Sequence, residues 1–284
     1  MDNRIKTCLL LTGMAVIIMT LGQIIGGSQG LIIAFIIALV TNIGVYWFSA
    51  SLVLAKTRAR VVGPADAPDL YKLVEHLAGR AGLPTPKVAI VDDPAPNAFA
   101  TGRNPQNAVV AVTTGLLKLV NREELAGVLG HELAHVKHRD ILIGSVAAVM
   151  ATVIMFLANM AKFASLFSGF RGDNRRGGAG NLLAGILLAV LAPLAALLIQ
   201  AAISRSREYL ADDGGADIAG SSLGLASALD KLQRSQGRIP MASASPETAS
   251  LYIVNPLSVS TFKNLFSTHP PTEERINRLR GMTI

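Results

Sequence analysis

Three residues in the middle of the chain have the spacing of two metal-binding side chains with a base beside them. His131, Glu132 and His135 stand in the order His-Glu-x-x-His. Side chains four residues apart lie on one face of a helix, so the two imidazoles could bind a single zinc ion. Glu132 follows the first histidine, and its carboxylate could take the proton of a water activated by that metal. The pattern therefore predicts attack of a zinc-activated hydroxide on a carbonyl group, with one Zn²⁺ per chain.

The residues around this motif predict a helix. Asn121 is a good N-cap, and Glu124 stands three residues further on, at the second position of a capping box. Apolar side chains then recur at helical spacing: Leu125, Val128, Leu129, Leu133 and Val136. A capped amphipathic helix would hold both histidines rigidly, which favours a real metal site over a chance match in an Ala- and Leu-rich stretch.

A third ligand is expected elsewhere, because a catalytic zinc ion has three protein ligands and one open position. Glu208 and Asp212 are i, i+4 neighbours just after the last apolar tract of the chain. Glu208 is the candidate ligand, and Asp212 could orient a ligand histidine through the second ring nitrogen. Asp140 is another candidate for such an orienting role. The alternative is that these carboxylates are ordinary solvated acids.

Charged residues are missing from three long tracts of the 284-residue chain. Hydrophobic residues make up 51% of it and charged residues 16%, against about 25% charged in an ordinary soluble domain. Residues 7–55, 141–161 and 177–204 contain no Asp, Glu, Lys or Arg. This excludes a purely soluble enzyme and a disordered chain, and the single Cys8 excludes a disulfide scaffold. The net charge of +7 is spread over scattered basic residues, so we expect no nucleic-acid partner.

The apolar tracts are long enough for membrane spans. A Gly-rich break at 22–30 divides the first tract into spans at 8–22 and 31–55, and we expect the first to be retained rather than cleaved as a signal peptide. Arg4 and Lys6 precede this hairpin and Lys56 follows it, which places both of its ends in the cytoplasm.

The later apolar tracts leave an alternative open. Segments 141–160 and 181–203 could each cross the bilayer, or they could be helices buried in the enzyme or lying in the membrane interface. A shared zinc site requires His135 and Glu208 to lie on the same side of the membrane. The chain between them must then cross an even number of times, and two crossings or none satisfy this. We favour two crossings.

Several motifs resemble, in the same order, those of the HtpX membrane zinc metalloproteases, which are relatives of the CAAX prenyl proteases. The resemblance implies that His131, His135 and Glu208 bind zinc and that Glu132 is the general base. The Gly-rich and acidic segment 212–217 departs from the family pattern and puts the local helix end in doubt. The resemblance covers most of the chain and is carried by the paired N-terminal spans and by residues 97–102, 131–140, 204–212 and 267–276.

The resemblance implies a mainly α membrane protein with about four transmembrane helices and a zincin-like α+β metalloprotease domain that contains a small β-sheet. Four parts are expected. Residues 1–55 would form the transmembrane hairpin, 56–140 a cytoplasmic protease part with the metal-binding helix, 141–203 a second apolar helix pair, and 204–284 a cytoplasmic protease part with the third ligand.

Two motifs receive further roles from the resemblance. Segments 88–91 and 108–112 read as strands flanking 97–102, in a sheet whose edge would pair with an extended substrate. Asn97 and Phe99 are the candidates for substrate contact, although Asn97 could also be an ordinary turn residue.

The last motif contains two more candidates. His269 could donate a hydrogen bond to the oxyanion, and Arg275 could bind an acidic partner near the metal. Alternatively, His-Pro-Pro at 269–271 only begins the final helix, 272–280.

The sequence thus predicts an integral-membrane zinc endopeptidase of the bacterial cytoplasmic (inner) membrane, multi-pass, with its active site and both termini in the cytoplasm. The resemblance implies cleavage of membrane or misfolded proteins, as quality control in a stress response. Its partners would be protein substrates and the lipid bilayer. Two alternatives are a prenyl-protein protease of the CAAX type and a non-proteolytic membrane chaperone with a structural zinc site.

Overall fold

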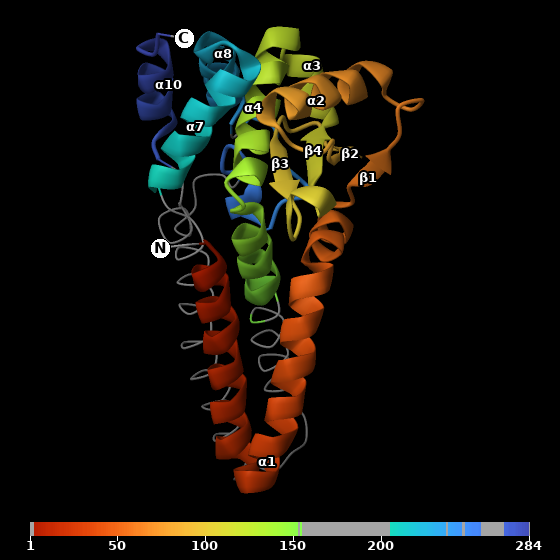
Figure 1. Cartoon of the computed structure of the whole chain (residues 1–284), viewed down its shortest axis with the longest axis vertical. Coiled ribbons are helices and arrows are strands. Elements are labelled where there is room, and N and C mark those ends of the chain that lie inside the picture. The colour runs from red at the N-terminus through yellow and green to blue at the C-terminus, as the bar shows by residue number, and fades with distance from the viewer. Residues whose placement is uncertain are drawn as a thin grey trace.

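The computed structural model of the chain describes residues 3–152, 154, 205–236, 238–245, 248–256 and 270–283. Figure 1 shows a head, in which helices surround a small sheet, and a long helical hairpin that extends from the head. The elements are α1 Asn3–Thr57, β1 Arg60–Val62, α2 Pro68–Ala81, β2 Lys87–Val91, β3 Ala98–Thr101, η1 Pro105–Asn107, β4 Val109–Thr113, α3 Thr114–Leu119, α4 Arg122–Lys137, the apolar helix Ile141–Thr152, α7 Arg205–Ala219, α8 Ser222–Ser235, η2 Ala249–Leu251 and α10 Thr272–Arg280.

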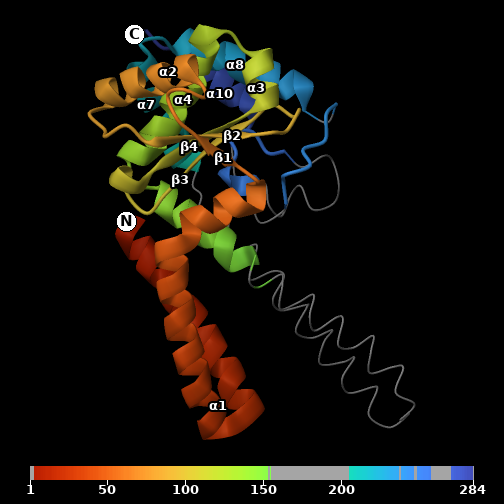
Figure 2. The same ribbon diagram turned by 90° about the vertical axis from the view of Figure 1, so that its right-hand side faces the viewer.

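A sharp reversal divides α1 into two arms that lie side by side in Figures 1 and 2. The reversal is at Gly27, whose φ of +58° and ψ of −144° are accessible to glycine and strained for other residues. It falls in the Gly-rich segment where the sequence predicts a turn. Across the arms, Asn42 Nδ2 donates a hydrogen bond to the Leu11 carbonyl at 3.0 Å. The first apolar tract is therefore a helical hairpin.

The second arm has the properties of a membrane-spanning helix. Within the described residues, one helix, Gly26–Thr57, is long and apolar enough to cross a membrane, and only 17% of its most apolar window is buried. Such a continuous exposed apolar surface marks contact with a membrane or a partner. Ile5–Thr20 and Ile141–Thr152 are shorter apolar helices. The predicted span 181–203 lies outside the described residues, and the span 141–160 lies only partly within them.

The sheet has the strand order β1-β2-β4-β3. β2 and β4 are parallel; β2 contains the predicted strand 88–91, and β4 lies one residue later than the predicted strand 108–112. β1 and β3 add to them as antiparallel outer strands. β3 is formed by the 97–102 motif itself, so the segment predicted to meet substrate is a strand at the edge of the sheet.

Both faces of the sheet are covered, which explains its continuous Val and Ala runs. On one face, Val88, Ala98 and Val110 pack in the cluster that contains α4. On the other face, Phe99 and Ala111 pack in the cluster that contains the apolar helix. Because the apolar helix follows directly after α4, the chain between them passes the β3 edge. There Thr101 Oγ1 and Ser145 Oγ are hydrogen-bonded at 2.7 Å.

A close glycine contact brings α7 against α4. A Cβ atom on Gly130 would lie 2.6 Å from the carbonyl oxygen of Gly215, and one on Gly215 would lie 2.6 Å from the backbone nitrogen of His131. α7 continues as a helix through the 212–217 segment, where the sequence puts a helix end in doubt. Because Gly130 and Gly215 have no side chains, α7 can touch α4, the helix that carries the metal-binding motif.

We expect Gly215→Ala to damage the metal site. Its methyl group would overlap the His131 backbone, and overpacking of this kind costs about 1–3 kcal/mol of unfolding free energy. Zinc affinity should fall as well, because α7 also carries Glu208. Zinc titration and chemical unfolding would measure both effects. The matched control is Gly79→Ala on α2, where nothing lies within 4 Å of the added methyl group. Equal behaviour of the two variants would contradict the prediction.

Candidate metal centre

The N-terminus of α4 is held by the predicted capping box. Asn121 Oδ1 accepts a hydrogen bond from the Glu124 backbone at 2.9 Å, and the Glu124 carboxylate accepts one from the Asn121 backbone at 2.8 Å. The same buried carboxylate accepts hydrogen bonds from Ser227 at 2.6 Å and Lys231 at 2.7 Å, both on α8. The start of the helix that carries the motif is therefore tied both to its own backbone and to a neighbouring helix.

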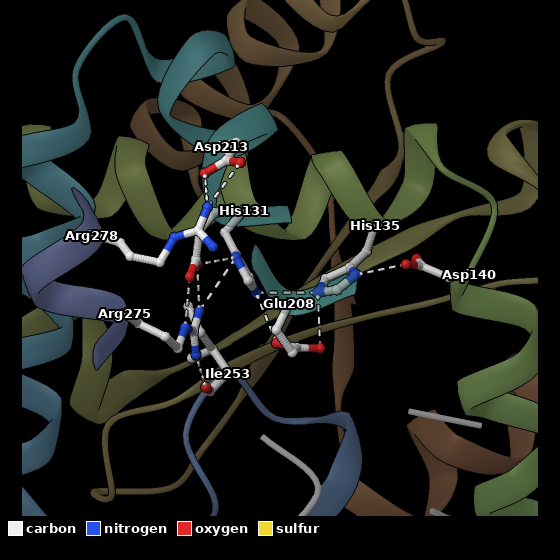
Figure 3. A network of polar contacts seen from close by, with 9 residues as sticks. His131, His135, Asp140, Glu208, Asp213, Ile253, Arg275 and Arg278 are labelled. Carbon is white, nitrogen blue, oxygen red and sulfur yellow. Dashed lines mark hydrogen bonds and ion pairs between the residues drawn. The ribbon is translucent and has the colours of Figure 1, made fainter. Parts of the chain in front are cut away.

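Three potential metal ligands converge between α4 and α7, as Figure 3 shows. Nε2 of His131 lies 3.1 Å from Nε2 of His135, and each lies 3.8 Å from an oxygen of Glu208. Ligand atoms bound to a tetrahedral zinc ion at about 2.0–2.1 Å lie roughly 3.3 Å apart. Their nitrogen and oxygen atoms are also those that zinc prefers. The three side chains thus fit a zinc ion in both distance and chemistry.

Each histidine is oriented by a carboxylate at its other ring nitrogen. Nδ1 of His131 lies 3.0 Å from Asp212 Oδ1, and Nδ1 of His135 lies 3.1 Å from Asp140 Oδ2. Asp140 reaches back to α4 because Arg139 has a φ of +57°, a left-handed conformation that ends the helix. A carboxylate at Nδ1 keeps the proton there, so Nε2 is free to bind a metal.

A buried arginine from α10 holds Asp212 in place. Arg275 is 1% exposed, and it donates to both oxygens of Asp212, from Nε at 2.9 Å and from Nη2 at 2.6 Å. Its Nη1 donates to the Ile253 carbonyl at 3.0 Å. Figure 3 shows the resulting chain of contacts from Arg275 to His131. Through Asp212, the arginine therefore connects the candidate ligand His131 to Ile253, more than a hundred positions later in the sequence.

Burial and neighbouring charges separate the pKa values of these groups. Burial raises the pKa of Glu132 to about 7 and lowers that of His131 to about 4. Burial would also lower the pKa of His135, but the carboxylates of Asp140, Glu208 and Glu132 together outweigh it and raise the pKa to about 10. For Asp212, burial is opposed by Arg275, which lowers the pKa to about 2. Asp212 is therefore ionised at neutral pH, and Glu132 is poised to exchange a proton.

The three ligand side chains and Glu132 line one cavity of about 50 Å³. This volume is sufficient for an ion and about one water molecule. Ala100 of β3 forms part of its wall, as do Arg207 of α7 and the residues 250–253. The cavity thus brings an acid–base group, a candidate metal site and the edge of the sheet together.

This arrangement agrees with the comparison with known proteins. The family model described as Peptidase family M48 matches residues 64–283. The chain belongs to this family. As an M48 protein it is a metalloendopeptidase, and the family implies a divalent metal at a site such as the one above.

Relatives of this M48 chain confirm the HtpX resemblance. The chain is 52% identical to a "Protease HtpX homolog" of Syntrophobacter fumaroxidans, over 99% of this chain and 100% of that one. It is 52% identical to one of Thermococcus kodakarensis, over 97% and 94%. In a crystal structure, Ste24p of S. mikatae has a similar fold, with a TM-score of 0.52 and 18% identity over 97% of this chain. The chain spans 65% of the length of that Ste24p chain.

Most predicted site residues of the M48 chain lie together in the structure. His131, Glu132 and His135 come from α4, Asp140 from the turn after it, Glu208 and Asp212 from α7, and Arg275 from α10. His269 lies outside the described residues, and its contact with an oxyanion stays a prediction.

The side chains of Asn97 and Phe99 are engaged inside the protein. Asn97 is 3% exposed, and its Nδ2 donates to the Val254 carbonyl at 2.8 Å. Phe99 is 1% exposed and packs edge-to-face on Tyr252, with ring centroids 5.2 Å apart. Direct contact of either side chain with substrate would require these contacts to break, so the backbone of β3 is the part of this motif that substrate can reach.

Several residues that line the cavity have no signal in the sequence. Ala100 is one of many alanines, and Tyr252 and Ile253 follow a Pro-, Ser- and Ala-rich stretch that predicts only a flexible connection. The short apolar run at 251–254 is the one pattern that could have indicated a buried segment.

Proposed function

We propose that the chain is an integral-membrane zinc endopeptidase that cleaves membrane or misfolded proteins at the cytoplasmic face of the bacterial inner membrane. It would hold one zinc ion per chain through His131, His135 and Glu208. The convergence of these three side chains around Glu132, in one cavity, is the observation that carries this function.

The side chains around the cavity have distinct roles in this proposal. A bound zinc ion would polarise the scissile carbonyl and lower the pKa of water toward about 7. Glu132 would accept the proton of the attacking water and pass it to the leaving amine. Asp212 and Asp140 would keep both histidines in the tautomer that binds metal. His269 would donate to the oxyanion.

The edge strand supports an extended polypeptide as substrate. In the described part of the sheet, β4 is the one strand that pairs with β3, and Ala100 on this strand lines the same cavity as Glu132. A substrate that adds to the sheet edge is recognised through its main chain, so many sequences can bind. This supports a broad preference for unfolded or misfolded protein.

The apolar helices support a multi-pass membrane protein. We infer about four spans: the two arms of α1, the apolar helix and the segment 181–203. Lys6 and Lys56 flank the hairpin at the ends that meet the head, which supports a cytoplasmic head and termini. Arg103 stacks over Trp47 at 4.4 Å, and such an aromatic–cation pair between head and hairpin suits a membrane–water boundary. The HtpX resemblance supports a quality-control role under stress.

Two other functions are less well supported. A prenyl-protein protease would act on lipid-modified substrates, and cleavage of unmodified unfolded protein would separate the two activities. A chaperone with a structural zinc site would use four protein ligands. Among the described residues, the cluster contains three, which is the number typical of catalytic zinc.

Removal of the metal tests the proposed function. We expect the full chain in detergent to bind one zinc ion, to degrade an unfolded test protein, and to lose this activity on chelation. Re-addition of zinc should restore it, because the ligands remain in place. Metal analysis and a time course of proteolysis measure both quantities, with His131→Ala as the zinc-free control. Full proteolysis by chain that metal analysis shows to be zinc-free would refute the proposed function.

A further inference from the structure

The β3 edge presents only two residues whose backbone groups point away from the sheet. In an antiparallel pair, alternate residues bond to the neighbouring strand. The Thr113 backbone donates to the Asn97 carbonyl at 3.0 Å, so in this register Asn97, Phe99 and Thr101 bond to β4. The backbone groups of Ala98 and Ala100 therefore face outward, where a substrate strand would pair, and the outward N–H of Ala100 donates to the Glu132 carboxylate.

A segment of the protein itself occupies the first of these two positions. We define residues 250–254 as the edge segment. Its Ile253 backbone donates to the Ala98 carbonyl at 3.1 Å, and its Val254 carbonyl accepts from Asn97 Nδ2 at 2.8 Å. Because residue 254 lies beside 97 and residue 253 beside 98, the edge segment runs antiparallel to β3. It takes the path that an added strand would take.

The edge segment is held firmly by buried groups. Arg275 donates to the Ile253 carbonyl, and Tyr252 is fully buried against Phe99. Before the segment, the Ser243 backbone and hydroxyl both donate to the buried Asp93 carboxylate, at 3.0 and 2.9 Å. The segment is thus part of the folded head and its position is tied to the metal-site arginine.

The cavity is correspondingly one-sided. Of the two outward-facing residues of β3, Ala100 lines the cavity and Ala98 does not, whereas Ile253, which bonds to Ala98, does line it. We propose that Ile253 and the rest of the edge segment set one end of the substrate cleft, so that a polypeptide is bound in extended form on one side of the scissile bond only. This inference rests on the proposed proteolytic function and deepens it. The enzyme would therefore favour peptide bonds that need an extended substrate segment on one side only. On the other side of the bond the substrate chain would have to end or turn away from the cleft, as it does near a chain end or in a flexible loop.

Two series of peptides around one cleavage site test this inference. The zinc-loaded full chain in detergent is assayed while one flank is kept short and the other is lengthened residue by residue. We expect kcat/KM to rise roughly tenfold along one series, mainly through KM. In the other series kcat/KM should stop rising after about one or two residues. Each residue of a strand spans about 3.3 Å, so a longer flank would meet the edge segment. An equal response of both series, whether both rise or both stop, would overturn the inference.

A variant of the anchor of the edge segment provides a second test. Asn97→Ala removes the hydrogen bond to the Val254 carbonyl and should let the shorter series gain from added residues, by several-fold in KM. The matched control is Asn107→Ala, which breaks a side-chain hydrogen bond to Asn104 (2.7 Å) in an exposed turn and should leave both series unchanged. A uniform fall for all peptides in Asn97→Ala would count against the inference. If this variant misfolds, the comparison of the two peptide series with the wild-type enzyme still tests the inference. Absence of any zinc-dependent peptide cleavage would instead refute the proposed function.

Discussion

Glu132→Gln is expected to lower kcat/KM for protein cleavage by about 10²–10⁴-fold, the range for loss of a positioned general base, while zinc stays bound. Glutamine has nearly the same size and shape as glutamate but cannot accept the proton of the attacking water. The site around Glu132 is suited to this proton transfer, because burial raises the pKa of its carboxyl group to about 7. The proposed zinc ligands are left intact by the change: His131, His135 and Glu208.

The measurement compares zinc content and kcat/KM of the wild type and the variant. Glu123→Gln is the matched control, since Glu123 lies on the same helix and is exposed. It should keep full activity and full zinc content. Wild-type activity in Glu132→Gln would show that another group is the base, and loss of zinc from the variant would show that Glu132 helps to hold the metal.

Arg275→Met is expected to weaken both folding and zinc binding. It leaves the Asp212 carboxylate, which is 2% exposed, without the cation that keeps it ionised. Breaking a buried ion pair in this way costs about 3–5 kcal/mol. Because Asp212 orients His131, zinc affinity should also fall about 10–100-fold, as for other residues that support metal ligands.

A matched arginine on the same helix separates this effect from a general loss of charge. Arg278 pairs with Asp213 at 3.3 Å, but the two side chains are 45% and 40% exposed to solvent. Arg278→Met should therefore change the unfolding free energy by less than about 1 kcal/mol and leave zinc affinity unchanged. Chemical unfolding and zinc titration of both variants give the comparison. Similar losses in the two would contradict a special role for Arg275.

A second change tests whether the damage comes from the unpaired carboxylate. In the double variant Arg275→Met with Asp212→Asn, no buried charge is left behind, so part of the folding free energy should return. Zinc affinity should stay low, because the neutral amide is a poorer partner for the Nδ1 proton of His131. Recovery of both properties would show that Asp212 does not support the metal ligand.

The chemistry of the site was largely predictable from sequence because its central part is local. The motif and its capping box lie within one helix, where the 3.6-residue period places His131 and His135 on one face. The capping box at Asn121 and Glu124 is present as expected. Charge-free tracts likewise indicate apolar helices from composition alone. Short strands of Val and Ala were found at nearly their predicted positions.

Other features depend on contacts between distant parts of the chain, and only the tertiary structure decided them. Arg275 and Asp212 are 63 positions apart, and Asn97 and Val254 are 157 apart. No local period relates such residues, because their distance is set by how α4, α7 and α10 pack. The pairing of Asp212 with His131 was therefore open until the helices were placed, whereas Asp140 and His135 are five positions apart and are brought together by the local turn at Arg139.

The sequence by itself determined the type of reaction, since that depends on which side chains share one helical face. The tertiary structure decided the shape of the cleft, since that depends on which segments lie beside the edge strand. The edge segment is the clearest case. Its residues carry no catalytic side chain and no motif, yet the backbone of Ile253 occupies half of the outward-facing positions of β3. Backbone hydrogen bonds do not depend on residue type, so no residue pattern could have revealed this one.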